Sequence, residues 1–258
     1  MHHLKIYNKE YKLHATYYDS FKNKDDVLIY FHGGGLIFGQ RNDLPREYVD
    51  VITQYFNLIT VDYRLLPESS FEDILIDLKR IYNYVIDRFQ HIYCMGRSAG
   101  GYLSLIFANQ YKTNGVINFY GYYDTDHPLF EKIPKNHLNV TSMLTNDLVT
   151  QLKKDRVTTA EPANPRYLLY LYYRHSGLWT SLINFSISND DLKKLPRMFI
   201  AHSINDPDVP YIYSENLNKL NKNSKLRTID GNIHDFDNTV THDTINLYHE
   251  ACEYIKNP

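Results

Sequence analysis

The chain has 258 residues, enough for one large α/β domain or two small ones, and its 28 basic and 30 acidic residues leave a formal net charge of -2. This balance and the lack of any run of basic residues disfavour nucleic-acid binding, and no apolar stretch approaches the roughly 20 residues that cross a bilayer, so we expect no membrane span. Residues 1–30 hold no apolar core of signal-peptide length, and Cys94 and Cys252 fit no metal or disulfide pattern, so we expect a cytoplasmic protein with reduced thiols.

Short apolar runs of strand type alternate along the chain with longer segments of helical apolar spacing. The first half predicts strands at residues 12–18, 26–32, 58–63, 91–95 and 115–120, and helices at 45–56, 71–87 and 100–110. The last part predicts a strand at 197–202, a helix at 211–221, an extended segment at 225–229 and a terminal helix at 242–255. This alternation predicts an α/β fold.

Residues 122–195 break the rhythm, because 74 residues separate two predicted strands that elsewhere are joined by far fewer. The tract is too long for a plain loop, and its apolar spacing predicts helices at 140–153 and 165–173. Six of the 24 tyrosines lie in it, which fits either an aromatic lid or tyrosines that replace other core aromatics. We expect a core of residues 1–121 and 196–258, with residues 122–195 inserted as a helical cap over one end of the sheet.

Glycine is scarce, and seven of the 11 glycines lie in two short windows, at 33–39 and 96–101. Glycine is used where the backbone turns sharply or approaches a ligand, so these windows are the first candidates for chemistry. The second window contains GRSAG, a G-x-S-x-G pattern around Ser98, between a predicted strand and a predicted helix. That context predicts a tight turn that exposes the Ser98 hydroxyl as a nucleophile. A glycine-rich junction with a passive serine is the alternative.

A serine nucleophile needs a base, an acid that orients the base, and fixed donors for the developing oxyanion. The first glycine window begins with HGGG at 32–35, directly after a strand of buried type. Two of these glycine N–H groups, together with that of Ala99, would form an oxyanion hole. The alternative is a phosphate-cradling loop, but the Lys-Ser/Thr ending of a P-loop and a G-x-G-x-x-G fingerprint are both missing.

The acid and the base have candidates in the last quarter of the chain. Asp206 follows a predicted strand, which is where an orienting carboxylate belongs, and Asp208 is its competitor. His234 lies in a loop before the terminal helix, from which its ring can reach Ser98. Less suited to the role of base are two histidines in regular elements, His202 and His242.

Four sequence blocks, taken in order, resemble the α/β-hydrolases and, within them, the hormone-sensitive-lipase-like carboxylesterases. HGGGLIFG at 32–39 is similar to the oxyanion motif of this family, and VDYRLLPESSFEDILID at 61–77 to its strand-plus-helix block. GRSAGG at 96–101 is similar to its nucleophile elbow, and DPDVP and HDF are similar to its acid and histidine segments. The resemblance implies a mostly parallel central sheet flanked by helices, with a helical cap inserted before the acid-bearing strand.

The resemblance also implies a role for each site residue. It implies Ser98 as nucleophile, His234 as general base and then acid, Asp206 as orienting carboxylate, and Gly34, Gly35 and Ala99 as oxyanion donors. Such a site needs no metal and no organic cofactor, and its partner is a small-molecule ester. Arg64 and Glu68 would brace the site, and the alternative is that they are simple surface charges.

Two departures from the family pattern leave the substrate open. Arg97 stands where the family has an acidic residue, and this cation would either attract acidic substrates or pair with a local carboxylate. The N-terminal cap common in the family is largely missing, so residues 122–195 must supply most of the lid. We expect a serine carboxylesterase that acts on small, short-acyl esters through an acyl-enzyme intermediate.

Several alternatives remain beside this expectation. The same three side chains would serve an amide or peptide hydrolase of formamidase or aminopeptidase type, or an esterase of acetylated sugars. A non-catalytic ligand-binding module on the same fold is a further alternative. The sequence leaves the oligomeric state open, with a homodimer among the options.

Overall fold

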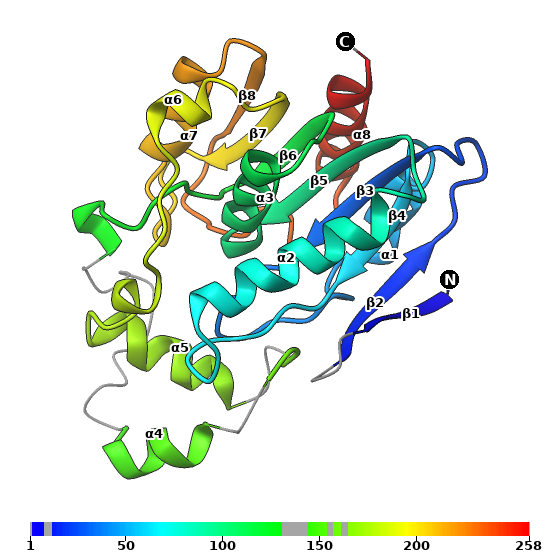
Figure 1. The fold of residues 1–258 in the computed structure, drawn as a ribbon. Coiled ribbons are helices and arrows are strands. Elements are labelled where there is room, and N and C mark those ends of the chain that lie inside the picture. Colours follow the sequence, from blue (N-terminus) through cyan, green and yellow to red (C-terminus); the bar gives the residue numbers. More distant parts are fainter. Residues whose placement is uncertain (1, 8–11, 131–143, 154–156, 161–164, 258) are drawn as a thin grey trace.

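The computed structural model describes residues 2–7, 12–130, 144–153, 157–160 and 165–257. One sheet runs through this part of the chain (Figure 1), in the strand order β1-β2-β4-β3-β5-β6-β7-β8. β1 and β2 pair antiparallel, as do β2 and β4, and all other neighbours are parallel. The strands are β1 (His2–Tyr7), β2 (Lys12–Tyr18), β3 (Asp26–Phe31), β4 (Asn57–Val61), β5 (His91–Arg97), β6 (Gly115–Phe119), β7 (Arg197–Ser203) and β8 (Ser224–Ile229).

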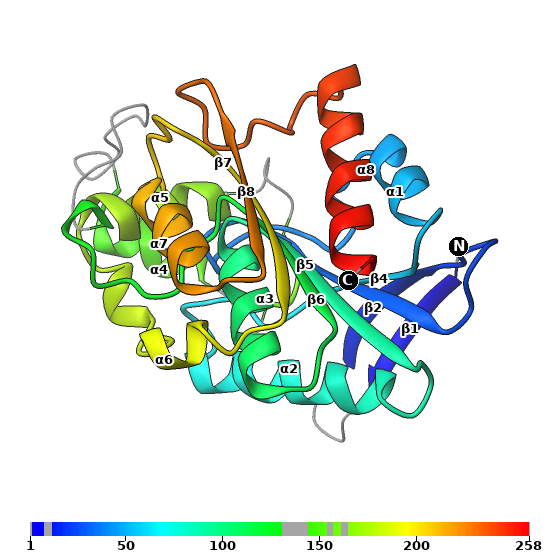
Figure 2. The same ribbon diagram turned by 90° about the horizontal axis from the view of Figure 1, so that it is seen from above.

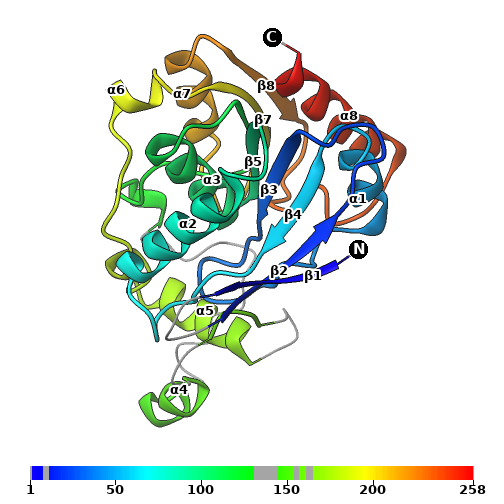
Figure 3. The same ribbon diagram turned by 45° about the vertical axis from the view of Figure 1, so that its right-hand side comes forward.

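Helices cover both faces of the sheet, as Figures 2 and 3 show. α1 (Arg46–Ile52) and α8 (His242–Lys256) pack on one face. α2 (Phe71–Val85), α3 (Ala99–Gln110) and α7 (Ile212–Leu220) pack on the other. This arrangement confirms the predicted mostly parallel sheet flanked by helices.

The central strand β3 shows why its sequence is apolar throughout. Side chains of a strand alternate between the two faces of a sheet, and both faces here are covered. Val27, Ile29 and Phe31 enter the core under α2 and α3, whereas Leu28 and Tyr30 enter the core under α1 and α8. A strand buried on both faces is expected to read as an unbroken apolar run, and VLIYF at 27–31 does.

The tract between β6 and β7 holds short helices: η1 (Pro128–Phe130), α4 (Asn146–Leu152), α5 (Arg166–His175), η2 (Thr180–Leu182) and α6 (Asn189–Leu192). α4 and α5 lie beyond the carboxyl ends of the central strands, whereas α6 lies beside α7 (Figure 1). α4 begins where the Thr145 hydroxyl accepts a hydrogen bond from the N–H of Leu148. The predicted helix start at 140–143 lies outside the described residues.

Three further observations complete the fold. β1 was not predicted, because its apolar signal is short: Leu4 and Ile6 pack against the core, whereas His2, His3 and Lys5 are exposed. Cys94 and Cys252 are free and buried, as predicted. None of the helices in the described ranges is long and apolar enough to cross a bilayer.

Candidate active site

The turn around Ser98 joins β5 to α3 and holds the serine in a strained backbone conformation. Ser98 has φ 53° and ψ -122°, a region that residues with a side chain rarely adopt. A Cβ on Gly96 would lie 1.9 Å from the carbonyl oxygen of Gly100, and a Cβ on Gly100 would lie 2.1 Å from that of Phe31. Both glycines are therefore required for the turn to pack against itself and against β3. The turn presents the Ser98 side chain at the carboxyl end of the sheet.

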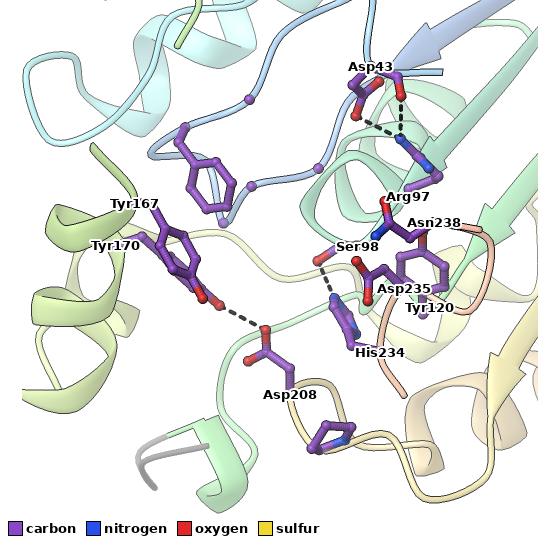
Figure 4. A pocket seen from close by; sticks show the side chains of 16 residues that line it. Asp43, Arg97, Ser98, Tyr120, Tyr167, Tyr170, Asp208, His234, Asp235 and Asn238 are labelled. Carbon is purple, nitrogen blue, oxygen red and sulfur yellow. Dashed lines mark hydrogen bonds and ion pairs between the residues drawn. The ribbon is translucent and has the colours of Figure 1, made fainter. Parts of the chain in front are cut away.

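The structure brings Ser98, His234 and Asp206 together in a chain of hydrogen bonds. Ser98 Oγ lies 2.9 Å from His234 Nε2 (Figure 4), and His234 Nδ1 lies 2.7 Å from Asp206 Oδ2. Asp206 follows β7, and His234 lies in the loop between β8 and α8. In the tautomer that satisfies both contacts, the Ser98 hydroxyl donates to Nε2 and Nδ1–H donates to the carboxylate. This arrangement can accept a proton from Ser98.

The Asp206 carboxylate is fully engaged. Its Oδ1 accepts hydrogen bonds from the N–H groups of Asp208 and Val209, at 2.8 and 2.9 Å. Its Oδ2 accepts from His234 and also from His202 Nε2, at 3.0 Å. Burial alone would raise the pKa of Asp206, but the two histidines outweigh it and hold that pKa well below its ordinary value. Asp206 is thus kept ionised beside the imidazole.

His202 is a residue whose role the sequence did not indicate. It was judged unsuited as a base because it lies in a strand, and the structure places it behind Asp206 instead. Its ring is fully buried, and its Nδ1 lies 2.7 Å from Ser214 Oγ. The available signal was its position near the end of β7, four residues before Asp206, but that spacing alone does not reveal the contact.

The electrostatic surroundings of His234 favour its protonated form. Burial disfavours the imidazolium, but the attraction and hydrogen bond of Asp206, with smaller contributions from Asp208 and Asp235, raise the pKa of His234 to about 9. Asp235 is exposed at the pocket edge (Figure 4). The local field is therefore negative.

The glycine-rich loop after β3 lies beside Ser98 and lines the same pocket. Gly34 and Gly35 have φ of 101° and 60°, so both adopt the left-handed region that favours glycine. A Cβ on Gly35 would lie 2.3 Å from the ring of Tyr170. Within the described residues, neither N–H of these two glycines donates to a backbone carbonyl. Both remain available to an oxygen of a substrate.

The pocket has a volume of about 370 Å³ and is walled on one side by α5 (Figure 4). Tyr167 and Tyr170 of α5 meet the ring of Phe38 edge-on, with centroid distances of 5.4 and 5.5 Å. Asp208, the competitor for the acid, accepts hydrogen bonds from Tyr170 Oη and Arg174 Nη2, each at 2.9 Å. The Asp208 carboxylate therefore binds α5, whereas the Asp206 carboxylate contacts His234.

Ion pairs show what Arg97 contacts and whether Arg64 and Glu68 are surface charges, two points that the sequence left open. Arg97 pairs with Asp43 at 2.8 Å and with Asp237 at 3.4 Å, so of the two expectations for Arg97 the pairing with local carboxylates is confirmed. Arg64 and Glu68 are buried in ion pairs and are not surface charges. Their partners are Asp73 and Asp77 for Arg64 and Arg166 for Glu68. Neither Arg64 nor Glu68 lines the pocket, and the carboxylates that pair with Arg64 belong to α2, outside the site.

The described residues include no group of three or more His, Cys, Asp or Glu side chains that could hold a metal ion. A hydroxyl next to an imidazole, an imidazole next to a carboxylate, and two unused backbone N–H groups together suit attack on a carbonyl carbon.

Comparisons with known proteins agree with this geometry. A family described by the alpha/beta hydrolase fold matches residues 28–238. A probable carboxylesterase M8 of Phoma sp. is 23% identical over 245 residues, which span 76% of this chain and 73% of that protein. Among solved structures, a protein of unknown function from Staphylococcus aureus has a TM-score of 0.92 and 31% identity, covering 99% of this chain and 98% of that one.

More distant structures share the fold. An alpha/beta hydrolase superfamily protein from Enterococcus faecalis has a TM-score of 0.83 and 26% identity, covering 96% of each chain. Carboxyl esterase 2 from Tuber melanosporum has a TM-score of 0.67 and 18% identity, covering 98% of this chain and 85% of that one. At that identity the likeness extends to the fold alone.

Proposed function

The chain belongs to the α/β-hydrolase family of hormone-sensitive-lipase-like, carboxylesterase-type hydrolases, and from this premise we propose that it is a serine esterase that cleaves small carboxylic esters through an acyl-enzyme intermediate. The observation that carries the proposal is the hydrogen-bonded chain from Ser98 through His234 to Asp206 at the wall of a pocket. We also propose that residues 122–195 form a cap on a core of residues 1–121 and 196–258.

The site residues have the following roles in the proposed reaction. Ser98 Oγ attacks the ester carbonyl while His234 Nε2 takes its proton, and Asp206 stabilises the imidazolium. The imidazolium then protonates the departing alcohol, which leaves an acyl group on Ser98. Water attacks this acyl-enzyme with His234 again as base, and the carboxylic acid departs. The oxyanion of both tetrahedral intermediates accepts hydrogen bonds from Gly34, Gly35 and Ala99.

The size of the pocket supports a small substrate. A volume of about 370 Å³ lies at the lower end of the range for small-molecule sites. Tyr170 closes the space above Gly35, and Phe38 packs against its ring. The tyrosine hydroxyls and carboxylates in the wall favour an ester with polar groups over a long fatty chain.

The test replaces the nucleophile and compares the result with replacement of a buried serine elsewhere. Ser98→Ala should lower turnover of p-nitrophenyl acetate by at least about a thousandfold and abolish labelling by a fluorophosphonate probe. Ser203→Ala is the matched control, because Ser203 is buried and its hydroxyl has no hydrogen-bond partner among the described residues. Wild-type turnover by Ser98→Ala would overturn the proposal. Faster cleavage of an aminoacyl p-nitroanilide than of the ester would reassign the enzyme to amides.

A further inference from the structure

The residue before the nucleophile is a buried cation whose guanidinium is bonded on every side. Arg97 Nε donates to Tyr30 Oη at 2.8 Å, Nη2 to Asp43 Oδ2 at 2.8 Å, and Nη1 to Asp237 Oδ2 at 3.4 Å. Burial disfavours its charged form, but the attraction of Asp43, Tyr30 and Asp237 outweighs burial and raises the pKa of Arg97 well above its ordinary value. The guanidinium thus stays charged and cannot turn toward a substrate carboxylate without leaving these partners.

Asp237 is the point at which this cation meets the loop that carries the histidine. Its side chain is fully buried, three residues after His234. Besides Arg97, the carboxylate accepts hydrogen bonds from Tyr120 Oη at 2.5 Å and Tyr248 Oη at 2.6 Å. Burial raises the pKa of both tyrosines well above the ordinary value, so both remain neutral donors. A fourth tyrosine, Tyr48, donates to the Asp237 carbonyl at 3.1 Å.

The same network touches the imidazole itself. The ring of Tyr120 lies against His234, with a centroid distance of 4.8 Å and an edge-on arrangement. In Figure 4, His234 lies below Ser98 and Tyr120 to its right. Phe236, between His234 and Asp237 in the chain, packs on the ring of Tyr120 at 5.3 Å. The His234 loop has no regular secondary structure, so its shape depends on contacts of this kind.

We propose that Arg97 is a positioning residue for the proposed reaction. Its contact with Asp237, which also binds Tyr120, holds the His234 loop against the nucleophile turn. This contact fixes the position of His234 relative to Ser98. Arg97 ends β5, directly before Ser98, and its two carboxylate partners lie in the segment after the glycine loop and in the histidine loop. One side chain therefore joins the nucleophile turn, the segment that follows the glycine loop, and the loop that carries the base. Removing the cation would leave two carboxylates without their charge partner, and Asp237 among them is fully buried.

The structure offers a matched control for this cation. Arg64 is likewise buried and paired with two carboxylates, Asp73 at 2.6 Å and Asp77 at 3.0 Å, but it does not line the pocket. Arg97→Met should lower kcat for p-nitrophenyl acetate by about 10- to 100-fold, because a shift of about 1 Å in a catalytic group has effects of that size, with KM changed less than twofold. Arg64→Met should lower the melting temperature comparably while kcat stays within twofold of wild type.

Further variants test the route through Asp237 and remain informative if Arg97→Met fails to fold. Asp237→Asn should reproduce the loss of kcat, and adding it to Arg97→Met should cost little more, since both act on one contact. Tyr120→Phe removes only the hydroxyl and keeps the ring against His234, so it should lower kcat by a smaller factor at unchanged KM. Arg97→Lys should restore part of the rate.

The positioning role of Arg97 rests on the proposed function, but different experimental results would overturn the one and the other. If Ser98→Ala is inactive but Arg97→Met and Tyr120→Phe keep the wild-type kcat, only the positioning role is overturned. Fully additive losses in Arg97→Met and Asp237→Asn, or an equal loss of kcat in Arg64→Met, would also overturn it, because either result would reduce Arg97 to a contributor to general stability. Activity in Ser98→Ala would instead overturn the proposed function itself.

Discussion

The charge on one imidazole determines the pH at which the proposed site can work. His234 must be neutral to accept the proton of Ser98, and its surroundings raise its pKa to about 9. The neutral fraction therefore grows as pH rises, and we expect kcat/KM to increase from pH 7 toward pH 10 before it levels off. Steady-state rates on an alkali-stable alkyl ester, followed by pH-stat titration, measure this profile.

Asp235 allows a direct test of why kcat/KM should rise only at alkaline pH. Its exposed carboxylate raises the pKa of His234, so Asp235→Asn should move the midpoint of the rise in kcat/KM to lower pH. The solvent screens an exposed charge, and the expected shift is only about 0.3 pH units. Asp230→Asn removes an exposed charge that does not line the pocket and should leave the midpoint in place. A profile that is flat from pH 6 to 10 would contradict the electrostatic picture.

Single residues also show how far the sequence could predict the site. Ser98, Asp206 and His234 were predicted as a set because each lies in a local pattern that follows a strand or precedes a helix. Asp237 was not predicted, because its partner Arg97 is 140 positions away and nothing local marks their contact. His202 was set aside as a base because it lies in a strand, and its spacing of four residues from Asp206 does not by itself reveal their contact.

Among the elements, the nucleophile turn is the one most tightly constrained by packing. Gly100 lies in the first turn of α3, where alanine would ordinarily favour a helix by about 1 kcal/mol. Its Cβ would however lie 2.1 Å from the carbonyl oxygen of Phe31 in β3, so Gly100→Ala should destabilise the fold by about 3 kcal/mol or more.

Urea denaturation measures the loss of stability in Gly100→Ala, with a glycine that has free space around it as the control. A Cβ on Gly231 would meet no atom closer than 3.9 Å, the Ile233 side chain, so Gly231→Ala should change stability by less than about 0.5 kcal/mol. Equal urea midpoints for Gly100→Ala and the wild type would show that β3 and α3 are not packed as described.

Helix α5 is tied to the glycine loop by another buried cation. Arg166 donates to the carbonyl of Ile37 at 2.8 Å and to that of Leu66 at 2.7 Å, and it forms a two-pronged ion pair with Glu68. Arg166→Met should loosen both α5 and the loop, and we expect kcat/KM to fall by about tenfold. Arg197→Met is the control, because Arg197 bonds to Tyr254 away from the pocket and should keep the wild-type rate.

Among the secondary-structure elements, the strands were easier to predict than the tract between β6 and β7. β3, β6 and β7 are short, mostly apolar runs, and their observed bounds agree with the predicted ranges to within one residue. α6 has only four residues, too few for a helical period to show in the sequence. The contacts of Arg166 with the glycine loop arise from distant segments, so the sequence pointed to helices in this tract but not to what holds them.

The whole molecule explains why tyrosine is so abundant. Tyr30, Tyr48, Tyr120 and Tyr248 are buried in the core or at its edge, and each hydroxyl donates a hydrogen bond or accepts one from Arg97 in the network around Asp237. Phenylalanine could fill the same space but could not satisfy these charges. Tyr167 and Tyr170 form the pocket wall. Tyrosine thus serves a buried hydrogen-bond network in one part of the molecule and the pocket wall in another.

The charge distribution of the molecule predicts which substrates the pocket prefers. The formal net charge of -2 is small, and two carboxylates of the pocket wall, Asp43 and Asp208, pair with Arg97 and Arg174. The carboxylate of Asp235 is exposed at the pocket edge. Arg97 is held by its carboxylate partners, so the field at the pocket mouth is negative. A field of this kind raises the local concentration of cations and repels anions.

We therefore expect an ester with a cationic alcohol to be cleaved with a higher kcat/KM than a neutral ester of the same shape. The comparison is acetylcholine against 3,3-dimethylbutyl acetate, with an expected ratio of about 3 to 10 at low ionic strength. Asp235→Asn should lower the ratio, as should added salt, because the carboxylate is exposed and screened over about 10 Å in 0.1 M salt. Asp243→Asn, outside the pocket in α8, should leave it unchanged. Faster cleavage of an ester with a carboxylate-bearing alcohol would contradict the sign of the field.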